Sequence, residues 1–194
     1  MTQYYKMPGF SLAYANASTK TLLTAFLLAV LGGLAVALLQ YLDRAGGGSH
    51  EGAVAWVRGN DDDARAREII PPKSYRELLS ITHEHAFSLP MLLFVLLHLV
   101  ALCTIGERAK IALYLLAFGA LGATMAAPWL VAYRGPEWAP LLRIGGSGLA
   151  LSIAASALIC LFETWLVRPL RRILRREDPP APDPLVRRRE PGET

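Results

Sequence analysis

The chain has 194 residues, which is enough for one compact domain, and 53% of them are hydrophobic. Its formal net charge is +4 at pH 7. The apolar residues form four blocks: Thr21 to Tyr41, Ala86 to Ile105, Ile111 to Ala132 and Ile144 to Val167. Each block is long enough to cross about 30 Å of hydrocarbon as a helix, and none alternates like a barrel strand. Composition therefore excludes a soluble domain and predicts an all-α integral membrane protein, a four-helix bundle.

In chain order we expect an N-terminal segment at 1–20, a transmembrane domain at 21–167 and a basic tail rich in proline and arginine at 168–194. The helices should span about 21–41, 75–105, 111–132 and 144–167, with an outer loop at 42–74. The first block is too long for a signal peptide and lacks a clean cleavage site. The second helix should begin near Tyr75, because Ser74 and Glu77 form an S-x-x-E capping box. Pro90 leaves open whether this helix is straight.

Basic residues predict the orientation. Of the 20 lysines and arginines, two precede the first helix, two lie between the second and third, and eight follow the fourth. The positive-inside rule then places both termini in the cytoplasm and the loop 42–74 on the outer side. We predict a bacterial inner membrane as the location, with the arginines after the fourth helix near anionic lipid.

Small residues four apart line three of the predicted helices. In the first they are Ala25, Ala29, Gly33 and Ala37. In lipid such a face lets helix backbones approach closely. We expect it to pack within the bundle, with contact to another protein as the alternative.

Three further residues lie near the inner ends of the helices. Cys103 and Cys160 are interpreted as small buried apolar side chains and not as a disulfide framework. Glu163 is expected to snorkel or to pair with Arg168.

The candidate site residues are three histidines of the second helix: His83, His85 and His98. His98 lies deep in the apolar run, where an ionisable residue suggests a function. His83 and His98 are 15 residues apart, about 22 Å along a helix and about 60° in rotation. This spacing would present one ligand to a b-type haem in each leaflet. His85 lies roughly 140° from His98 on a straight helix.

The second axial haem ligand has no obvious source. His50 and Met125 are the internal choices, and a two-fold homodimer or another subunit would also supply one. Two other ligands compete with haem b. The segment Thr82 to His85 would suit copper or zinc, with the same three histidines as metal ligands. A quinone headgroup would suit a pocket beside His83 or His85, near a cluster on the outer rim: Trp129, Tyr133, Arg134, Glu137 and Trp138.

Residues 58 to 165 resemble a known family. The shared stretches are RGN, ELLSITHEHAFSLP, PWLVAY and GGSGLALSIAASALICLFETW. They are similar to small proteobacterial inner-membrane proteins with a THxHxF motif, some of which carry a c-type haem motif in the outer loop. The resemblance implies membrane redox work near cytochromes, with His83 and His85 as the motif histidines. No CxxCH occurs in this chain, so we expect no covalent c-haem.

Three functional hypotheses follow. The first is a redox-associated membrane protein that binds b-type haem or quinone at the second helix and works with a larger electron-transfer complex or a periplasmic cytochrome. The second is a non-catalytic accessory subunit of a respiratory or photosynthetic complex. The third is a metal-handling membrane protein. No P-loop, GxSxG, HExxH or Rossmann fingerprint indicates a stand-alone enzyme, and no nucleic-acid partner is expected.

Overall fold

A computed structural model describes residues 11–43, 49–61 and 69–170. These residues form five α-helices: α1 (Ala17–Asp43), α2 (His50–Arg58), α3 (Tyr75–Ala101), α4 (Glu107–Tyr133) and α5 (Ala139–Trp165). Short 3₁₀ turns, η2 (Leu12–Tyr14) and η3 (Pro136–Trp138), precede α1 and α5. Within the described ranges there is no strand, and four helices are long and apolar enough to cross a membrane. The predicted all-α four-helix membrane bundle is confirmed.

The helix ends differ from the predicted ones by a few residues, for local reasons. α1 begins at Ala17 because the side chain of Asn16 accepts the backbone N–H of Thr19 at 2.9 Å. α3 begins where predicted, and Ser74 and Glu77 form the capping box. It ends at Ala101 rather than Ile105, because a tight turn leads to Gly106, the N-cap of α4. α3 also runs through Pro90 as one helix.

α2 was not predicted, and the segment that contains His50 was assigned to a loop. It is a nine-residue helix whose N-cap, Ser49, accepts the backbone N–H of Gly52 at 2.9 Å. Val57 is buried against Val131 of α4 and Ala139 of α5. Such a short segment gains its stability from this packing, since an isolated helix of that length is marginal in water.

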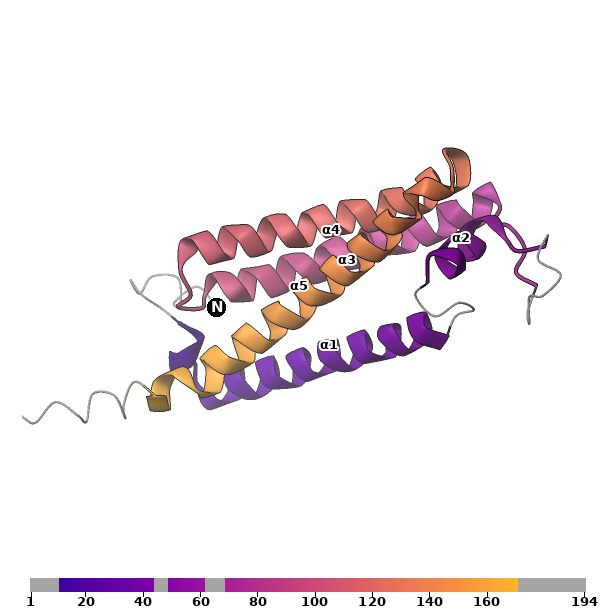
Figure 1. The fold of residues 1–194 in the computed structure, drawn as a ribbon. Helices are drawn as coiled ribbons and strands as arrows, with labels where there is room; N and C mark the ends of the chain where they lie inside the picture. The colour runs from indigo at the N-terminus through magenta and orange to yellow at the C-terminus, as the bar shows by residue number, and fades with distance from the viewer. Residues whose placement is uncertain (1–10, 44–48, 62–68, 171–194) are drawn as a thin grey trace, which may run out of the picture.

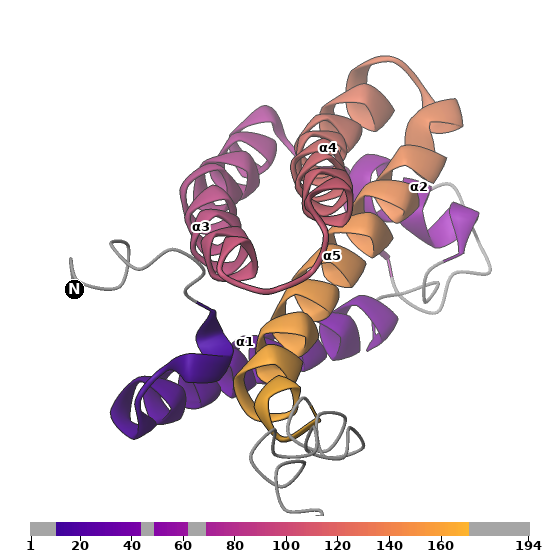
Figure 2. The ribbon, with the colours of Figure 1, turned by 90° about the vertical axis from the view of Figure 1, so that its left-hand side faces the viewer.

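The long helices surround α5 (Figures 1 and 2). α3 and α4 lie side by side, α5 crosses them obliquely, and α1 packs mainly on α5. α2 covers one end of α4 and α5. The largest buried side chains of the core come from α1 and α3: Leu27, Leu93, Leu96 and Val100.

α4 and α5 approach most closely at two glycines. A Cβ on Gly145 would lie 2.8 Å from the backbone nitrogen of Thr124, and one on Gly148 would lie 3.1 Å from the Cβ of Ala120. Ser152, Ser156 and Cys160 continue the same buried line. The small-residue face of α5 therefore packs within the bundle, as predicted.

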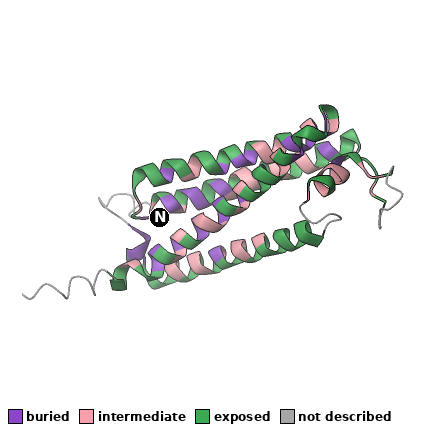
Figure 3. Ribbon diagram, viewed as in Figure 1, coloured by how far each residue is buried: buried purple, intermediate pink, exposed green. Residues whose placement is uncertain are grey.

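The small-residue face of α1 does not. Ala25, Ala29, Gly33 and Ala37 are all exposed, and a Cβ on Gly33 would meet nothing within 4 Å. Figure 3 shows α1 as almost entirely exposed or half-buried. The expectation of packing within the bundle is wrong for this helix, because α1 turns a different face to the core, with Leu27 buried and Phe26 and Val30 packed against the same cluster. The small-residue face is left for lipid or another protein.

The contact at Gly145 predicts a stability change. Gly145→Ala should lower the free energy of unfolding by roughly 1–3 kcal/mol, since the added methyl meets the backbone of α4. Gly122→Ala is the matched control, because Gly122 is exposed on α4 with nothing within 4 Å. That variant should be neutral or slightly stabilising. Unfolding of the purified protein in detergent measures both, and equal stability of the two variants would contradict the close contact.

Candidate functional site

A cavity of about 470 Å³ lies at the end of the bundle where α3 begins and α4 ends. Its volume is within the usual range for small-molecule sites. Every long helix contributes to it, together with α2 and the segment that precedes α3. Its walls are mostly apolar and aromatic, and His85, Glu84, Lys73 and Thr82 supply the polar groups. The remaining lining residues are Tyr41, Gly52, Ala53, Trp56, Ile81, Thr124, Met125, Pro128, Leu142 and Gly146.

His85 is held in one orientation by its own helix. Its Nδ1 lies 2.7 Å from the carbonyl oxygen of Ile81, one turn earlier. A carbonyl oxygen only accepts, so Nδ1 carries a proton and donates it. In the neutral ring the lone pair is then on Nε2. His85 lines the cavity, so it offers an oriented imidazole to a ligand there.

Thr82 and Trp129 join α3 to α4 beside the cavity. Trp129 Nε1 donates to Thr82 Oγ1 at 2.8 Å, and Thr82 Oγ1 donates to the carbonyl of Leu78 at 2.8 Å. The indole also stacks on Tyr133, with ring centroids 6.0 Å apart, and meets the edge of Tyr75 at 5.5 Å. Trp129 and Tyr133, two residues of the predicted aromatic cluster, therefore pack together next to the cavity.

Contacts of the RGN stretch, residues 58–60, hold the end of α2 against the segment that precedes α3. Gly59 ends α2 with a φ of +80°, where a Cβ would lie 2.8 Å from the carbonyl oxygen of Ile70. Asn60 accepts the backbone N–H of Ile70 at 2.6 Å. These contacts bring Lys73 over the ring of Trp56, at 5.4 Å. Both residues line the cavity.

The three predicted site histidines are not brought together. His83 and His98 are exposed on the outer face of α3, where His83 meets the edge of Phe87 and His98 stacks on Phe94. Only His85 lines the cavity. Over residues 11–43, 49–61 and 69–170, no group of three or more His, Cys, Asp or Glu side chains is placed to hold a metal ion. Within these ranges the histidines therefore do not form a single metal centre.

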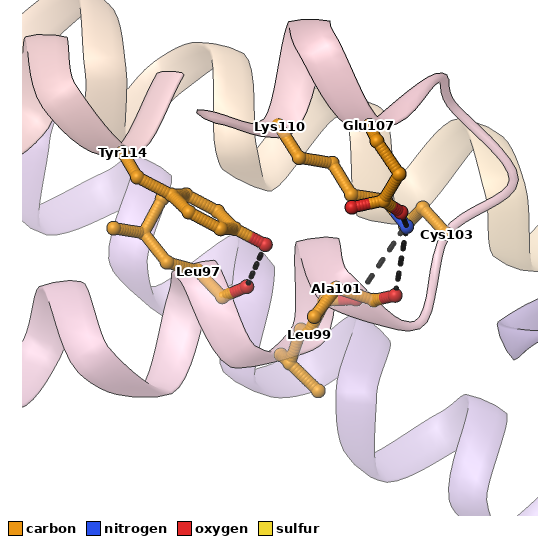
Figure 4. A network of polar contacts seen from close by, with 7 residues as sticks. All are labelled: Leu97, Leu99, Ala101, Cys103, Glu107, Lys110 and Tyr114. Carbon is orange, nitrogen blue, oxygen red and sulfur yellow. Dashed lines mark hydrogen bonds and ion pairs between the residues drawn. The ribbon is translucent and has the colours of Figure 1, made fainter. Parts of the chain in front are cut away.

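The opposite end of the bundle carries a second polar cluster. Glu163 is 2% exposed and accepts hydrogen bonds from the hydroxyls of Ser11 and Thr104. The expectation that it snorkels or pairs with Arg168 is wrong, because the turn after α3 and the segment before α1 enclose it. Lys110 donates to the carbonyl of Ala101 at 3.0 Å and pairs with Glu107 at 3.0 Å (Figure 4).

Sequence reasoning missed several lining residues of the cavity. Trp56 and Lys73 were not predicted as site residues. They share a cavity with His85 only because α2 and the segment before α3 fold against the bundle. Met125 was considered only as a haem ligand, and it does line the same cavity as His85. The sequence signal for this arrangement was the RGN stretch, because a Gly-Asn pair after a short apolar run indicates a turn.

Four helices that are long and apolar enough to cross a bilayer define a multi-pass membrane protein. Residues 47–171 match a family described as a transmembrane helical domain, and the match covers more than half of the chain. The chain belongs to that family. No curated protein matches it, and no solved structure does.

The geometry of His85 predicts its tautomer. In alkaline buffer, ¹⁵N NMR of the protein in detergent should show a protonated Nδ1 and a bare Nε2 for this ring, because the carbonyl of Ile81 holds the Nδ1 proton. The His85→Asn variant assigns the signals by removing them. A protonated Nε2 with a bare Nδ1 would be inconsistent with the contact.

Proposed function

We propose that this chain is a redox-associated membrane protein that binds the headgroup of a quinone in the outer cavity. His85 is the residue that recognises it. The support is the anchored imidazole in a largely apolar cavity of about 470 Å³. A quinol hydroxyl donates to a bare Nε2, and a protonated imidazole donates to a quinone carbonyl. The resemblance of the THxHxF stretch to proteins associated with cytochromes points to the same chemistry.

The walls of the cavity suit a flat, amphipathic ring. Tyr41 and Trp56 supply aromatic surface, and Met125 and Pro128 line the cavity from α4. Lys73, which lies over Trp56, adds a cation near the mouth that favours a reduced, negatively charged ring. The lipid tail of a quinone would leave along the apolar faces of the bundle.

A b-type haem is the second candidate, and Met125 is the observation that favours it. An imidazole and a thioether are a known axial pair for haem iron, and His85 and Met125 come from different helices to line one cavity. In that reading the haem would not need His83 or His98. Those two face outward on α3, where a second copy of the chain or another subunit would reach them.

We also propose that the protein works beside other membrane subunits. The exposed small-residue face of α1 supports this, because such faces let a neighbouring helix approach closely in lipid. A purely accessory subunit of a larger complex is the alternative. The charge asymmetry supports a bacterial inner membrane with both termini in the cytoplasm, so that the His85 cavity faces outward.

Quinone binding tests the proposal. His85→Ala should weaken the binding of decylubiquinone to the full chain in nanodiscs by at least about fivefold, since one hydrogen bond in a buried site contributes on the order of 1–3 kcal/mol. Quenching of tryptophan fluorescence measures the affinity, because Trp56 lines the cavity. His83→Ala is the control and should bind as the wild type does, since it lies two residues away on the exposed face.

The same preparations decide between the candidates. A dithionite-reduced minus oxidised spectrum with a haem α-band, lost in both His85→Ala and Met125→Leu, would favour the haem. A featureless spectrum with His85-dependent binding supports the quinone. Equal binding by the wild type and His85→Ala would overturn the assignment of this cavity.

The orientation has its own test. Single cysteines are placed at Asp61 and at Arg168 in a background where Cys103 and Cys160 are serine. Both positions are exposed, one in the outer segment and one after α5. A membrane-impermeant maleimide added to intact cells with a permeabilised outer membrane should label Asp61→Cys and leave Arg168→Cys unlabelled. The reverse pattern would show that the chain is inserted the other way.

A further inference from the structure

Two buried thiols meet at the end of the bundle opposite the His85 cavity. The Sγ atoms of Cys103 and Cys160 are 3.9 Å apart, although the residues are 57 positions apart in the chain. Cys103 lies in the turn after α3, and Cys160 lies on the small-residue face of α5. They are 4% and 0% exposed, and they are the only two cysteines of the chain. Any disulfide within one chain must join these two.

The pair needs only a small movement to react. A disulfide has its sulfurs about 2 Å apart, so the thiols must approach by roughly that distance. Cys160 is fixed within α5. Cys103 lies in a non-helical turn, where its backbone N–H donates to the carbonyl of Val100 at 3.0 Å. Its thiol donates to the carbonyl of Leu99 at 3.5 Å, and Figure 4 draws both Cys103 and Leu99. That turn can shift without unwinding a membrane helix.

A groove of about 610 Å³ lies at the same end of the bundle, lined by residues that adjoin both cysteines in the chain. Thr104 and Ile105, which follow Cys103, form one part of its wall, and Ile159 and Leu161, which flank Cys160, form another. Apart from Thr104 and Glu163 the wall is apolar, which suits a hydrophobic reactant from the bilayer. Neither sulfur lines the groove, so the shift of the turn must also bring Cys103 to the reactant.

Glu163 supplies a base at the same place. It lies one turn after Cys160, and its charge acts on Cys103. The hydrogen bond to Cys160 and then burial raise the pKa of the Cys103 thiol above its ordinary value. The thiolate is the reactive form of a cysteine, so oxidation of the pair needs a nearby proton acceptor.

We propose that Cys103 and Cys160 form a redox-active dithiol that a lipid-soluble quinone, bound in this groove, oxidises to a disulfide. Both S–H bonds break and one S–S bond forms. The quinone takes the two electrons and two protons and leaves as quinol. Glu163 accepts the first thiol proton and passes it to the quinone oxygen. The disulfide would tie the turn between α3 and α4 to α5. This site is separate from the His85 cavity and does not rest on the function proposed for it.

The test counts free thiols in the full chain in nanodiscs. Reduced protein is incubated anaerobically with decylubiquinone, denatured, and treated with a maleimide that adds mass. The wild type should lose both mass tags and recover them with dithiothreitol, with about one quinol formed per chain. Cys103→Ser and Cys160→Ser should each keep their single tag. Glu163→Gln should slow the loss by at least roughly tenfold without changing the end point, as expected for the loss of a general base.

Three results would overturn the proposal. The first is that both tags are retained in the presence of decylubiquinone while diamide removes them. The second is that disulfides form only between chains. The third is that Glu163→Gln loses its tags at the wild-type rate. The His85→Ala variant separates this site from the outer cavity, because it should oxidise its thiols at the wild-type rate. Loss of quinone binding at His85 with intact thiol oxidation, or the converse, would eliminate one site and leave the other.

Discussion

The close approach of α5 to α4 is the contact on which the rest of the bundle depends. At Gly145 the two backbones come so near that even a methyl group would meet the nitrogen of Thr124. In hydrocarbon there is little hydrophobic force between helices, so association relies on tight packing of this kind. α5 also carries most of the packing of α1 onto the bundle. Without this contact, α1 and the α3–α4 pair would share little surface.

The oblique course of α5 gives the bundle two different ends. At one end the helices leave room for a cavity, which α2 and the segment before α3 cover and where His85 is held by its own helix. At the other end α5 meets the turn after α3, so that Cys160 and Glu163 approach Cys103 and Thr104. The two described polar sites therefore lie near the ends of the helices, where polar groups cost less than at the centre of the bilayer.

Exposed features of the chain support the proposal that it works beside other membrane subunits. The small-residue face of α1 and the face of α3 with His83 and His98 both lie on the outside of the bundle. In a self-contained bundle the small residues of a helix would be buried. In α1 they are exposed, and of its described side chains only Leu27 is buried. Its stability in the membrane comes from its own backbone hydrogen bonds and from lipid as much as from this chain.

The sequence by itself determined the class of fold, because a run of about 20 apolar residues must form its backbone hydrogen bonds internally in lipid. Local signals also placed the start of α3 at its capping box, and the histidines as the candidate site residues. Only the tertiary structure decided which histidine faces a cavity, because one face of α3 is covered by α4 and α5 and the other is not. Only the tertiary structure also brings Glu163 and the two cysteines to their partners. Their partners are 57 to 152 residues away, and no local pattern records a contact made by the crossing of helices.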